Sequence, residues 1–159
     1  MQIKTAIGQD SHRFEEAQSD KQCIIGGVLF DEIPALSGNS DADVVLHAIT
    51  NAISGITGRN ILGKIADDMC RQGITDSREY LKVAVADLTE YEISNISISI
   101  EGKRPKISPR IEAMKETIAR LLAVNKTAVG ITATTGEGLT AFGRGEGLQA
   151  FVILTVLKP

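Results

Sequence analysis

Only two histidines are present in the 159 residues of the chain, and each lies in a short acidic motif. The first motif is Asp10-Ser11-His12, and the second covers residues 40–47 and ends at His47. Because alternate residues of a strand point to the same face, Asp10 and His12 could offer a carboxylate oxygen and an imidazole nitrogen to one point. With His47 as a third ligand, the set would match a catalytic zinc site, which has three protein ligands and one open position.

Both motifs also have a purely structural interpretation. An Asp-x-His motif alone is weak, and a single histidine on a helix usually has a packing role. Asp41 and Asp43 fall in the expected first turn of a helix, where carboxylates interact favourably with the helix dipole, and we favour a capping role for Asp43. Asp43 could also orient the imidazole of His47 as an outer partner of a metal site. From these residues alone, a shared metal site and separate structural roles are about equally supported.

A glycine-rich segment, residues 134–147, could bind anions. Part of it matches the relaxed dinucleotide pattern G-x-G-x-x-G/A, but that fingerprint needs a helix directly after the turn, and here a short terminal strand follows. No Gly-Lys-Ser/Thr ends the run, so it is not a Walker A loop. Backbone N–H groups and the hydroxyls of Thr134 and Thr135 could still bind phosphate, and Glu137 could hold a divalent cation. The alternative is a flexible hairpin whose glycines only permit positive φ.

The composition is that of a soluble globular protein, with 43% hydrophobic and 23% charged residues. A net charge of −3 and the lack of a basic stripe argue against a nucleic-acid binder. Cys23 and Cys70 form no CxxC pair, which favours reduced thiols and a cytoplasmic location. The N-terminal residues lack an apolar signal core, and the longest apolar stretch, residues 150–157, is too short to span a bilayer.

The hydrophobic pattern predicts a single α+β domain over residues 1–159. Strands are expected at residues 2–9, 22–30, 93–101, 128–134 and 148–157, and the second is interrupted by Gly26-Gly27, which could mark a bend or bulge. In residues 93–101, isoleucines at 96, 98 and 100 alternate with serines at 97 and 99, which predicts a half-buried strand. Helices are expected from Ser40 to Gly58, from Ser77 to Tyr91 and after Pro109, with residues 59–74 irregular or briefly helical. At the first helix, Ser40 would be the N-cap and Asp43 would complete a capping box. This order predicts a two-layer sandwich, in which helices cover one face of a mixed sheet and neighbouring subunits could cover the other.

Five segments across nearly the whole chain resemble a known enzyme family in order and approximate spacing. They are IGQDSHRF (7–14), SDADVVLHA (40–48), RPKISP (104–109), TTGEGL (134–139) and GRGEG (143–147). Together they resemble the 2-C-methyl-D-erythritol 2,4-cyclodiphosphate synthase family of non-mevalonate isoprenoid biosynthesis. The resemblance implies a homotrimer with sheets facing the central axis and active sites between adjacent subunits, in the cytoplasm or, for a processed plastid protein, the stroma. The implied substrate is 4-diphosphocytidyl-2-C-methyl-D-erythritol 2-phosphate, whose 2-phosphate attacks the β-phosphorus and releases CMP.

The same resemblance assigns roles to individual residues. Asp10, His12 and His47 would bind zinc or another divalent transition metal, a Lewis acid for the β-phosphate. Glu137 would help to hold a second ion, Mg²⁺ or Mn²⁺, and Thr135 would position the phosphates at the transition state. The remaining substrate contacts implied by the family are Ser40, Gly63, Asp68, Gly102, Lys106, Ile107, Ser108, Ala133, Thr134 and Arg144. Of these, residues 102–108 and 133–135 would form the cytidine pocket, and Arg144 with Glu146 would lie near the central channel, either paired or touching a ligand.

The chain departs from the family pattern at three positions beside the expected site. Asn39 replaces a histidine assigned to the transferring phosphate, so a positive charge is lost although a hydrogen-bond donor remains. Ile61 and Cys70 replace two aspartates of the methylerythritol loop, in which Asp68 is retained. Three interpretations are compatible with this pattern. The chain could be an active synthase that uses Asp67 and Asp68 differently, or an enzyme that acts on a related diphosphate. It could also be a zinc- and nucleotide-binding trimer with altered or lost catalysis. We predict synthase activity.

Overall fold

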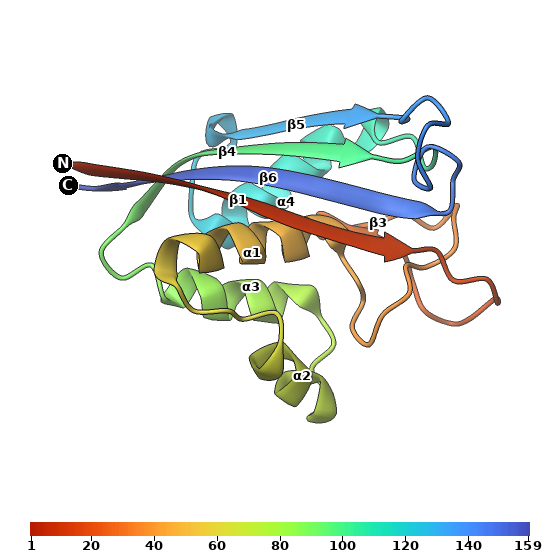
Figure 1. The fold of residues 1–159 in the computed structure, drawn as a ribbon, viewed down its shortest axis with the longest axis horizontal. Coiled ribbons are helices and arrows are strands. Elements are labelled where there is room, and N and C mark those ends of the chain that lie inside the picture. Colours follow the sequence, from red (N-terminus) through yellow and green to blue (C-terminus); the bar gives the residue numbers. More distant parts are fainter.

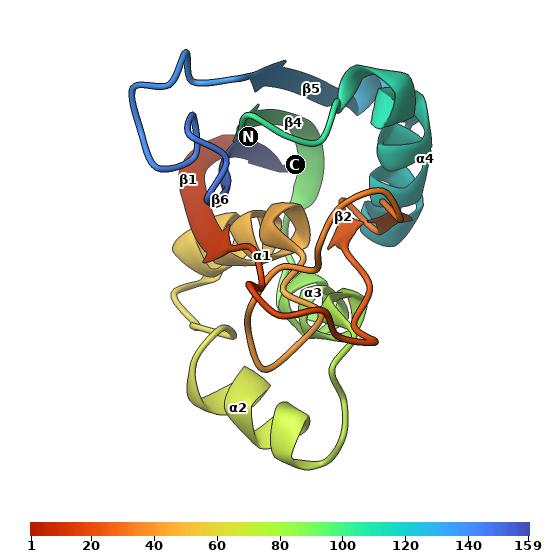
Figure 2. The same cartoon turned by 90° about the vertical axis from the view of Figure 1, so that its right-hand side faces the viewer.

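A mixed four-stranded sheet, with helices on one face, forms the frame of the computed structural model, which describes residues 1–159 (Figures 1 and 2). The strands are β1 (Gln2–Arg13), β4 (Glu92–Glu101), β5 (Val129–Thr134) and β6 (Gly147–Lys158), in the spatial order β1-β6-β4-β5. Strands β4 and β5 are parallel, whereas β6 is antiparallel to both of its neighbours. The expected α+β class with a mixed sheet is confirmed.

Four α-helices lie on the side of the buried face of the sheet. They are α1 (Val44–Thr57), α2 (Lys64–Arg71), α3 (Ser77–Ala86) and α4 (Ile111–Leu122), and short 3₁₀ turns lie at Ser108–Arg110 and Lys126–Ala128. Helices α1 and α4 pack directly against the strands, α3 packs on α1, and α2 lies farthest from the sheet (Figures 1 and 2). No helix is long and apolar enough to cross a bilayer.

Strand β4 shows how the sequence pattern creates the core. Ile96, Ile98 and Ile100 are almost fully buried against the helices, while Ser97 and Ser99 are exposed on the opposite face. The predicted alternation is therefore confirmed.

The opposite face of the sheet is partly apolar and is not covered within the chain. Ile3, Ile7, Phe151 and Ile153 have exposed fractions of 62, 65, 36 and 49%. Ile7 and Ile153 are direct cross-strand partners, so their side chains form one continuous exposed patch.

Apart from the start of the first helix, three predicted boundaries were wrong. Strand β1 continues to Arg13 instead of ending at residue 9, because its whole length pairs with β6. The strand expected at 22–30 is a hairpin of two-residue strands, β2 (Ile24–Ile25) and β3 (Val28–Leu29), since Gly26 and Gly27 have positive φ and reverse the chain. Helix α3 ends at Ala86 instead of Tyr91, because the last turn tightens and the N–H of Asp87 bonds to Ala84.

The first helix begins at Val44, and its N-cap is Asp43 instead of Ser40. Ala42 has φ +55°, so a right-handed helix cannot run through it from Ser40. The Asp43 carboxylate accepts the N–H groups of Val45 and Leu46 at 3.1 Å each. It also accepts those of the hairpin residues Gly26 and Gly27, at 2.8 and 2.7 Å. The capping role of Asp43 is confirmed, whereas the capping box from Ser40 was wrong.

Candidate metal centre

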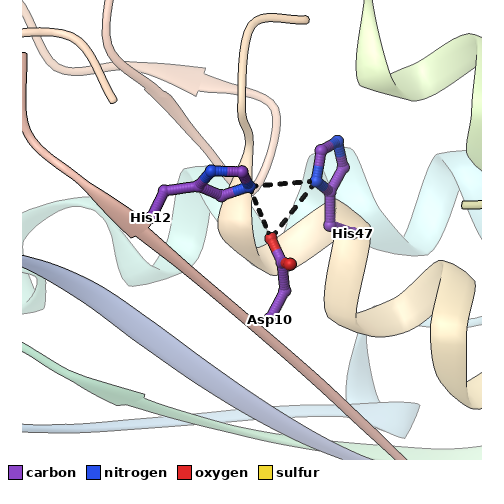
Figure 3. A group of neighbouring side chains, drawn as sticks. All are labelled: Asp10, His12 and His47. Atoms are coloured by element: carbon purple, nitrogen blue, oxygen red, sulfur yellow. Dashed lines mark hydrogen bonds and ion pairs between the residues drawn. The ribbon is translucent and has the colours of Figure 1, made fainter. Parts of the chain in front are cut away.

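Asp10, His12 and His47 converge on one point between β1 and α1 (Figure 3). Oδ2 of Asp10 lies 2.8 Å from Nε2 of His12 and 3.2 Å from Nδ1 of His47. The two imidazole nitrogens are 3.3 Å apart. The structure therefore brings together the three residues that the sequence singled out as metal ligands.

Local structure explains this convergence. Asp10 and His12 are alternate residues of β1 and project from the face of the sheet that packs on α1. His47 lies in the first turn of α1, which Asp43 holds at a fixed distance from the hairpin. His47 is buried, and Asp10 and His12 are half-buried.

The protonation of His12 is set by its backbone partner. Nδ1 of His12 lies 2.8 Å from the carbonyl oxygen of Ser37, which can only accept a hydrogen bond. Nδ1 therefore carries the proton, and in the neutral ring Nε2 offers its lone pair toward Asp10 and His47. Such an outer contact fixes the ring of a metal-binding histidine.

The donor set fits a divalent metal. Two ligand bonds of about 2.0–2.1 Å that meet at a tetrahedral angle place their donor atoms about 3.3 Å apart. The three separations of 2.8, 3.2 and 3.3 Å are close to this spacing. One carboxylate oxygen and two imidazole nitrogens are also ligands that zinc prefers.

The electrostatics of the cluster favour positive charge at its centre. Burial alone would raise the pKa of Asp10, but the hydrogen bonds and charges of the two histidines outweigh it and lower this pKa. Burial alone would lower the pKa of His12, yet the hydrogen bond and charge of Asp10 raise it. The negative charge of Asp10 therefore favours a proton on His12, and it would favour a metal cation at the same place.

The proposed outer contact from Asp43 to His47 was wrong. The Asp43 carboxylate bonds only backbone N–H groups, including those of Gly26 and Val45. On the side away from Asp10, Nε2 of His47 instead lies 2.8 Å from the hydroxyl of Ser77 in α3.

A cavity of about 350 Å³ opens beside these three candidate ligands, between residues 38–40 and helix α2. Asn39, Ser40, Gly63, Asp67 and Cys70 line it together with the ligands. A neighbouring cavity of about 370 Å³ shares Asn39, Asp67 and Cys70 and adds Arg71. A larger cavity of about 560 Å³, between residues 15–23 and 29–35, contains none of the ligands.

The positions where the chain departs from the family pattern differ in their environments. Ile61 is fully buried in the core and cannot contact a ligand in the cavity. The thiol of Cys70 lies 2.8 Å from the hydroxyl of Tyr80 at the cavity wall. Asp68 does not line either cavity, and its carboxylate pairs with Lys64 at 2.9 Å and with Arg71.

The two segments expected to bind cytidine lie next to one another. The N–H of Gly102 donates to the carbonyl oxygen of Thr134 at 3.0 Å, and Ile100 pairs with Ala133 in the sheet. Lys106 is exposed, Ile107 is buried and Ser108 begins a 3₁₀ turn.

The glycine-rich loop presents hydroxyl and carboxylate groups to solvent. The hydroxyl oxygens of Thr134 and Thr135 accept the N–H groups of Gly136 and Glu137 at 3.3 and 3.2 Å, so both hydroxyl protons are free to donate. Glu137 has φ +53°, and its exposed carboxylate makes no hydrogen bond or ion pair within the chain. Arg144 pairs with Glu146 at 3.4 Å, the structural alternative considered for these residues.

The structure does not bring this second group of residues to the metal ligands. The cavity at Asp10, His12 and His47 is lined by no residue of 102–108 or 133–137. Within one chain, the two halves of the expected site are therefore separate.

Several residues at the site escaped the sequence interpretation. The sequence pattern indicates Ser77 only as a helix start and Tyr80 only as part of a helix. The carbonyl of Ser37 carries no side-chain signal at all. For Asp41 the pattern indicates only an interaction with the helix dipole. In the structure, its carboxylate accepts the hydroxyl of Ser77 and, at 3.2 Å, the N–H of Ser77. These contacts join residues that are far apart in the sequence, so they can be identified only from the structure.

Comparison with known proteins supplies the family. Residues 3–157 match the model of the YgbB family. A 2-C-methyl-D-erythritol 2,4-cyclodiphosphate synthase of Chlamydia muridarum is 50% identical over 157 residues, which is 98% of this chain and 88% of that protein. The solved synthase of Plasmodium vivax is 27% identical, with a TM-score of 0.83 over 99% of both chains. Another solved synthase, in a CDP-bound form, is 26% identical, with a TM-score of 0.81 over 97% of this chain and 100% of the other.

Proposed function

The chain belongs to the YgbB family, and from this premise we propose that it is a 2-C-methyl-D-erythritol 2,4-cyclodiphosphate synthase. It converts 4-diphosphocytidyl-2-C-methyl-D-erythritol 2-phosphate to the 2,4-cyclodiphosphate and releases CMP. An oxygen of the 2-phosphate forms a bond to the β-phosphorus, and the bond from that phosphorus to the bridging oxygen breaks, so that CMP leaves with this oxygen. The observation that carries the proposal is the convergence of Asp10, His12 and His47 in a chain of this family.

The reaction brings an anionic phosphate to an anionic diphosphate, so it requires positive charge. We assign zinc to Asp10, His12 and His47, and Mg²⁺ or Mn²⁺ to Glu137. When bound, these ions would supply Lewis-acid polarisation and neutralise the diphosphate oxygens. The free carboxylate of Glu137 and the lone pairs that face one another at the first site support this assignment.

Two polar side chains would position the reacting phosphates. Asn39 lines both cavities beside the metal ligands, where its amide can donate to a phosphate oxygen. The hydroxyl proton of Thr135 is not used within the chain, so it can donate to an oxygen of the transition state. Ser40 and Gly63 line the same cavity as Asn39 and would contact the methylerythritol part.

For the cytidine nucleotide we propose a pocket of residues 102–108 and 133–135. The hydrogen bond from Gly102 to Thr134 holds the two segments together, which supports this pocket. A relative with a CDP-bound structure supports the choice of ligand. Gly102, Lys106, Ile107, Ser108, Ala133 and Thr134 would bind the base and ribose, largely through backbone groups, and Arg144 would lie near the central channel.

A homotrimer would complete the site. The metal ligands and the Thr135 segment lie in separate parts of one chain, so one active site would take the first from one subunit and the second from its neighbour. The exposed face of the sheet carries an apolar patch that such an assembly would bury, formed by Ile3, Ile7, Phe151 and Ile153.

A single-turnover assay tests the activity. Enzyme in excess over the cytidine diphospho substrate, with Zn²⁺ and Mg²⁺, should yield CMP and a cyclic diphosphate by phosphorus NMR. Binding of CMP without turnover would instead indicate a nucleotide-binding trimer, and a different phosphorylated product would indicate a redirected enzyme. Either result would overturn the synthase proposal.

Mixing inactive variants tests the shared site. His47→Ala and Thr135→Ala remove different halves, so random mixed trimers should regain roughly a quarter of wild-type activity. A mixture of His47→Ala with His12→Ala is the control, because both remove the same half and no intact site can form. Activity that stays absent in the first mixture would contradict an active site between subunits.

A further inference from the structure

Ser77 is a fully buried residue whose hydroxyl contacts the imidazole of His47, one of the proposed metal ligands. It begins helix α3, and its Oγ lies 2.8 Å from Nε2 of His47. Nδ1 of the same ring faces Asp10. The hydroxyl therefore lies on the side of the imidazole opposite to the metal centre.

The direction of this hydrogen bond follows from the second partner of Ser77. Its hydroxyl donates to Oδ1 of Asp41, and its backbone N–H donates to Oδ2 of the same carboxylate at 3.2 Å. A hydroxyl has one proton, so toward His47 it can only accept. Nε2 of His47 must therefore donate, and in the neutral ring the lone pair is left on Nδ1.

Asp41 is itself fixed in place by backbone contacts. Its N–H donates to the carbonyl oxygen of Thr75 at 2.9 Å, and its Oδ1 accepts the N–H of Asp43 at 3.1 Å. A second hydroxyl, that of Ser40, lies 3.4 Å from Nε2 of His47, which is too long to replace the contact with Ser77. The carboxylate, the hydroxyl and the imidazole thus form one chain of hydrogen bonds across the 38–43 loop, α3 and α1.

We propose that Asp41 and Ser77 are positioning residues that hold His47 as an Nδ1 donor to the metal. They do for His47 what the carbonyl of Ser37 does for His12, since each outer contact places the proton on the nitrogen remote from Asp10. Outer partners of this kind typically change metal affinity by about 10–100-fold. This inference rests on the metal site of the proposed function.

Ser77→Ala is the primary test, with zinc affinity measured by competition against a chromophoric chelator. We expect about 10–100-fold weaker binding, because the ring loses the contact that fixes its proton and orientation. Ser77→Thr keeps the hydroxyl and should restore the affinity to near the wild-type value. Ser54→Ala is the matched control, since Ser54 is also a buried serine and lies in α1, where its hydroxyl accepts the N–H of Ile61 and makes no hydrogen bond to His47.

A spectroscopic readout separates positioning from general destabilisation. In the zinc-loaded wild type, nitrogen NMR should show a slowly exchanging proton on Nε2 of His47, and this proton should exchange faster in Ser77→Ala. If Ser77→Ala does not fold, Ser77→Cys retains the volume with a weaker acceptor and should also bind zinc more weakly than the wild type. Wild-type affinity in whichever of these variants folds would overturn the inference, as would a Ser77→Thr variant as weak as Ser77→Ala. A wild-type protein that binds no zinc would instead overturn the metal site itself.

Discussion

Gly8 of β1 lies directly against the backbone of Ala48 in α1. A Cβ atom at Gly8 would overlap the carbonyl oxygen of Ala48 and would lie only 2.5 Å from the backbone nitrogen of Ala52. Gly8 comes two residues before Asp10, and Ala48 directly follows His47. The contact between these two backbones therefore sets the distance between the strand and helix that carry the proposed metal ligands.

We expect Gly8→Ala to destabilise the fold by about 3 kcal/mol and to weaken metal binding. The added methyl meets backbone atoms that cannot rotate away, so the helix must shift as a unit. Gly130→Ala is the control, because its nearest neighbour would be the Ile96 carbonyl oxygen at 3.9 Å. Urea unfolding and zinc titration of both variants would measure the effect. Equal stability of the two would show that the close approach of β1 and α1 is not required.

Removal of the metal should destabilise the protein, since a ligand that binds only the folded state contributes about 4 kcal/mol at 1,000 times its Kd. Chelation should therefore lower Tm in the wild type but hardly in His47→Ala, which lacks one ligand. Elemental analysis should find zinc in the wild type and little in His47→Ala. Asp67→Asn, which changes the cavity wall but no ligand, should retain the metal. Full zinc content in His47→Ala would contradict the ligand assignment.

The stabilisation by zinc should become smaller as the pH falls. The pKa of His12 is raised in the metal-free fold, so protonated His12 stabilises that fold below about pH 6.5, and this contribution is lost as the pH rises through the raised pKa. Zinc needs the unprotonated Nε2, so its affinity changes in the opposite direction. The Tm difference between zinc-loaded and chelator-treated protein should thus be larger at about pH 8 than at about pH 5. A difference that does not change with pH would be inconsistent with His12 as a ligand.

The neighbouring residues Asp67 and Asp68 of α2 can be mutated as a matched pair, to test which carboxylate contacts the substrate. The family resemblance assigns substrate contact to Asp68, whereas the carboxylate that lines the cavity belongs to Asp67. From the geometry we expect Asp67→Asn to raise KM about tenfold or more, and Asp68→Asn to change it little, because Asp68 is held by Lys64 and Arg71. Steady-state kinetics of both variants would decide. The reverse order would show that α2 rearranges when substrate binds.

The local sequence pattern was sufficient to predict those parts of the fold and the site that depend on periodicity. The two-residue spacing of Asp10 and His12 placed both side chains on one face of β1, and the alternating isoleucines of β4 identified the buried face of the sheet. The end at Gly58 of the helix that carries His47 was also predicted, because glycine is common directly after a helix, and Gly58 has the left-handed conformation found there.

Features that depend on distant contacts could not be predicted in this way. Ser40 and Asp43 are both good caps, and the choice between them is made by the N–H groups of Gly26 and Gly27 in a separate hairpin. Ser77 reaches His47 only because α3 packs on α1, and no local motif records that contact. Asp68 aligned with the family pattern, but in the structure it pairs with Lys64 and Arg71 and does not line the cavity beside Asp10, His12 and His47.

The pairing of Gln2 with Lys158 brings the two ends of the chain side by side, at the end of the sheet away from the metal centre (Figure 1). Asp10 is about 26 Å from Gln2 along β1 at the rise of a strand. A short linker could therefore join the ends, and new ends could be opened between α3 and β4, which gives a circular permutant with the same sheet order. A tag or fused domain at either end would likewise remain remote from Asp10, so immobilised or labelled protein should keep its metal chemistry.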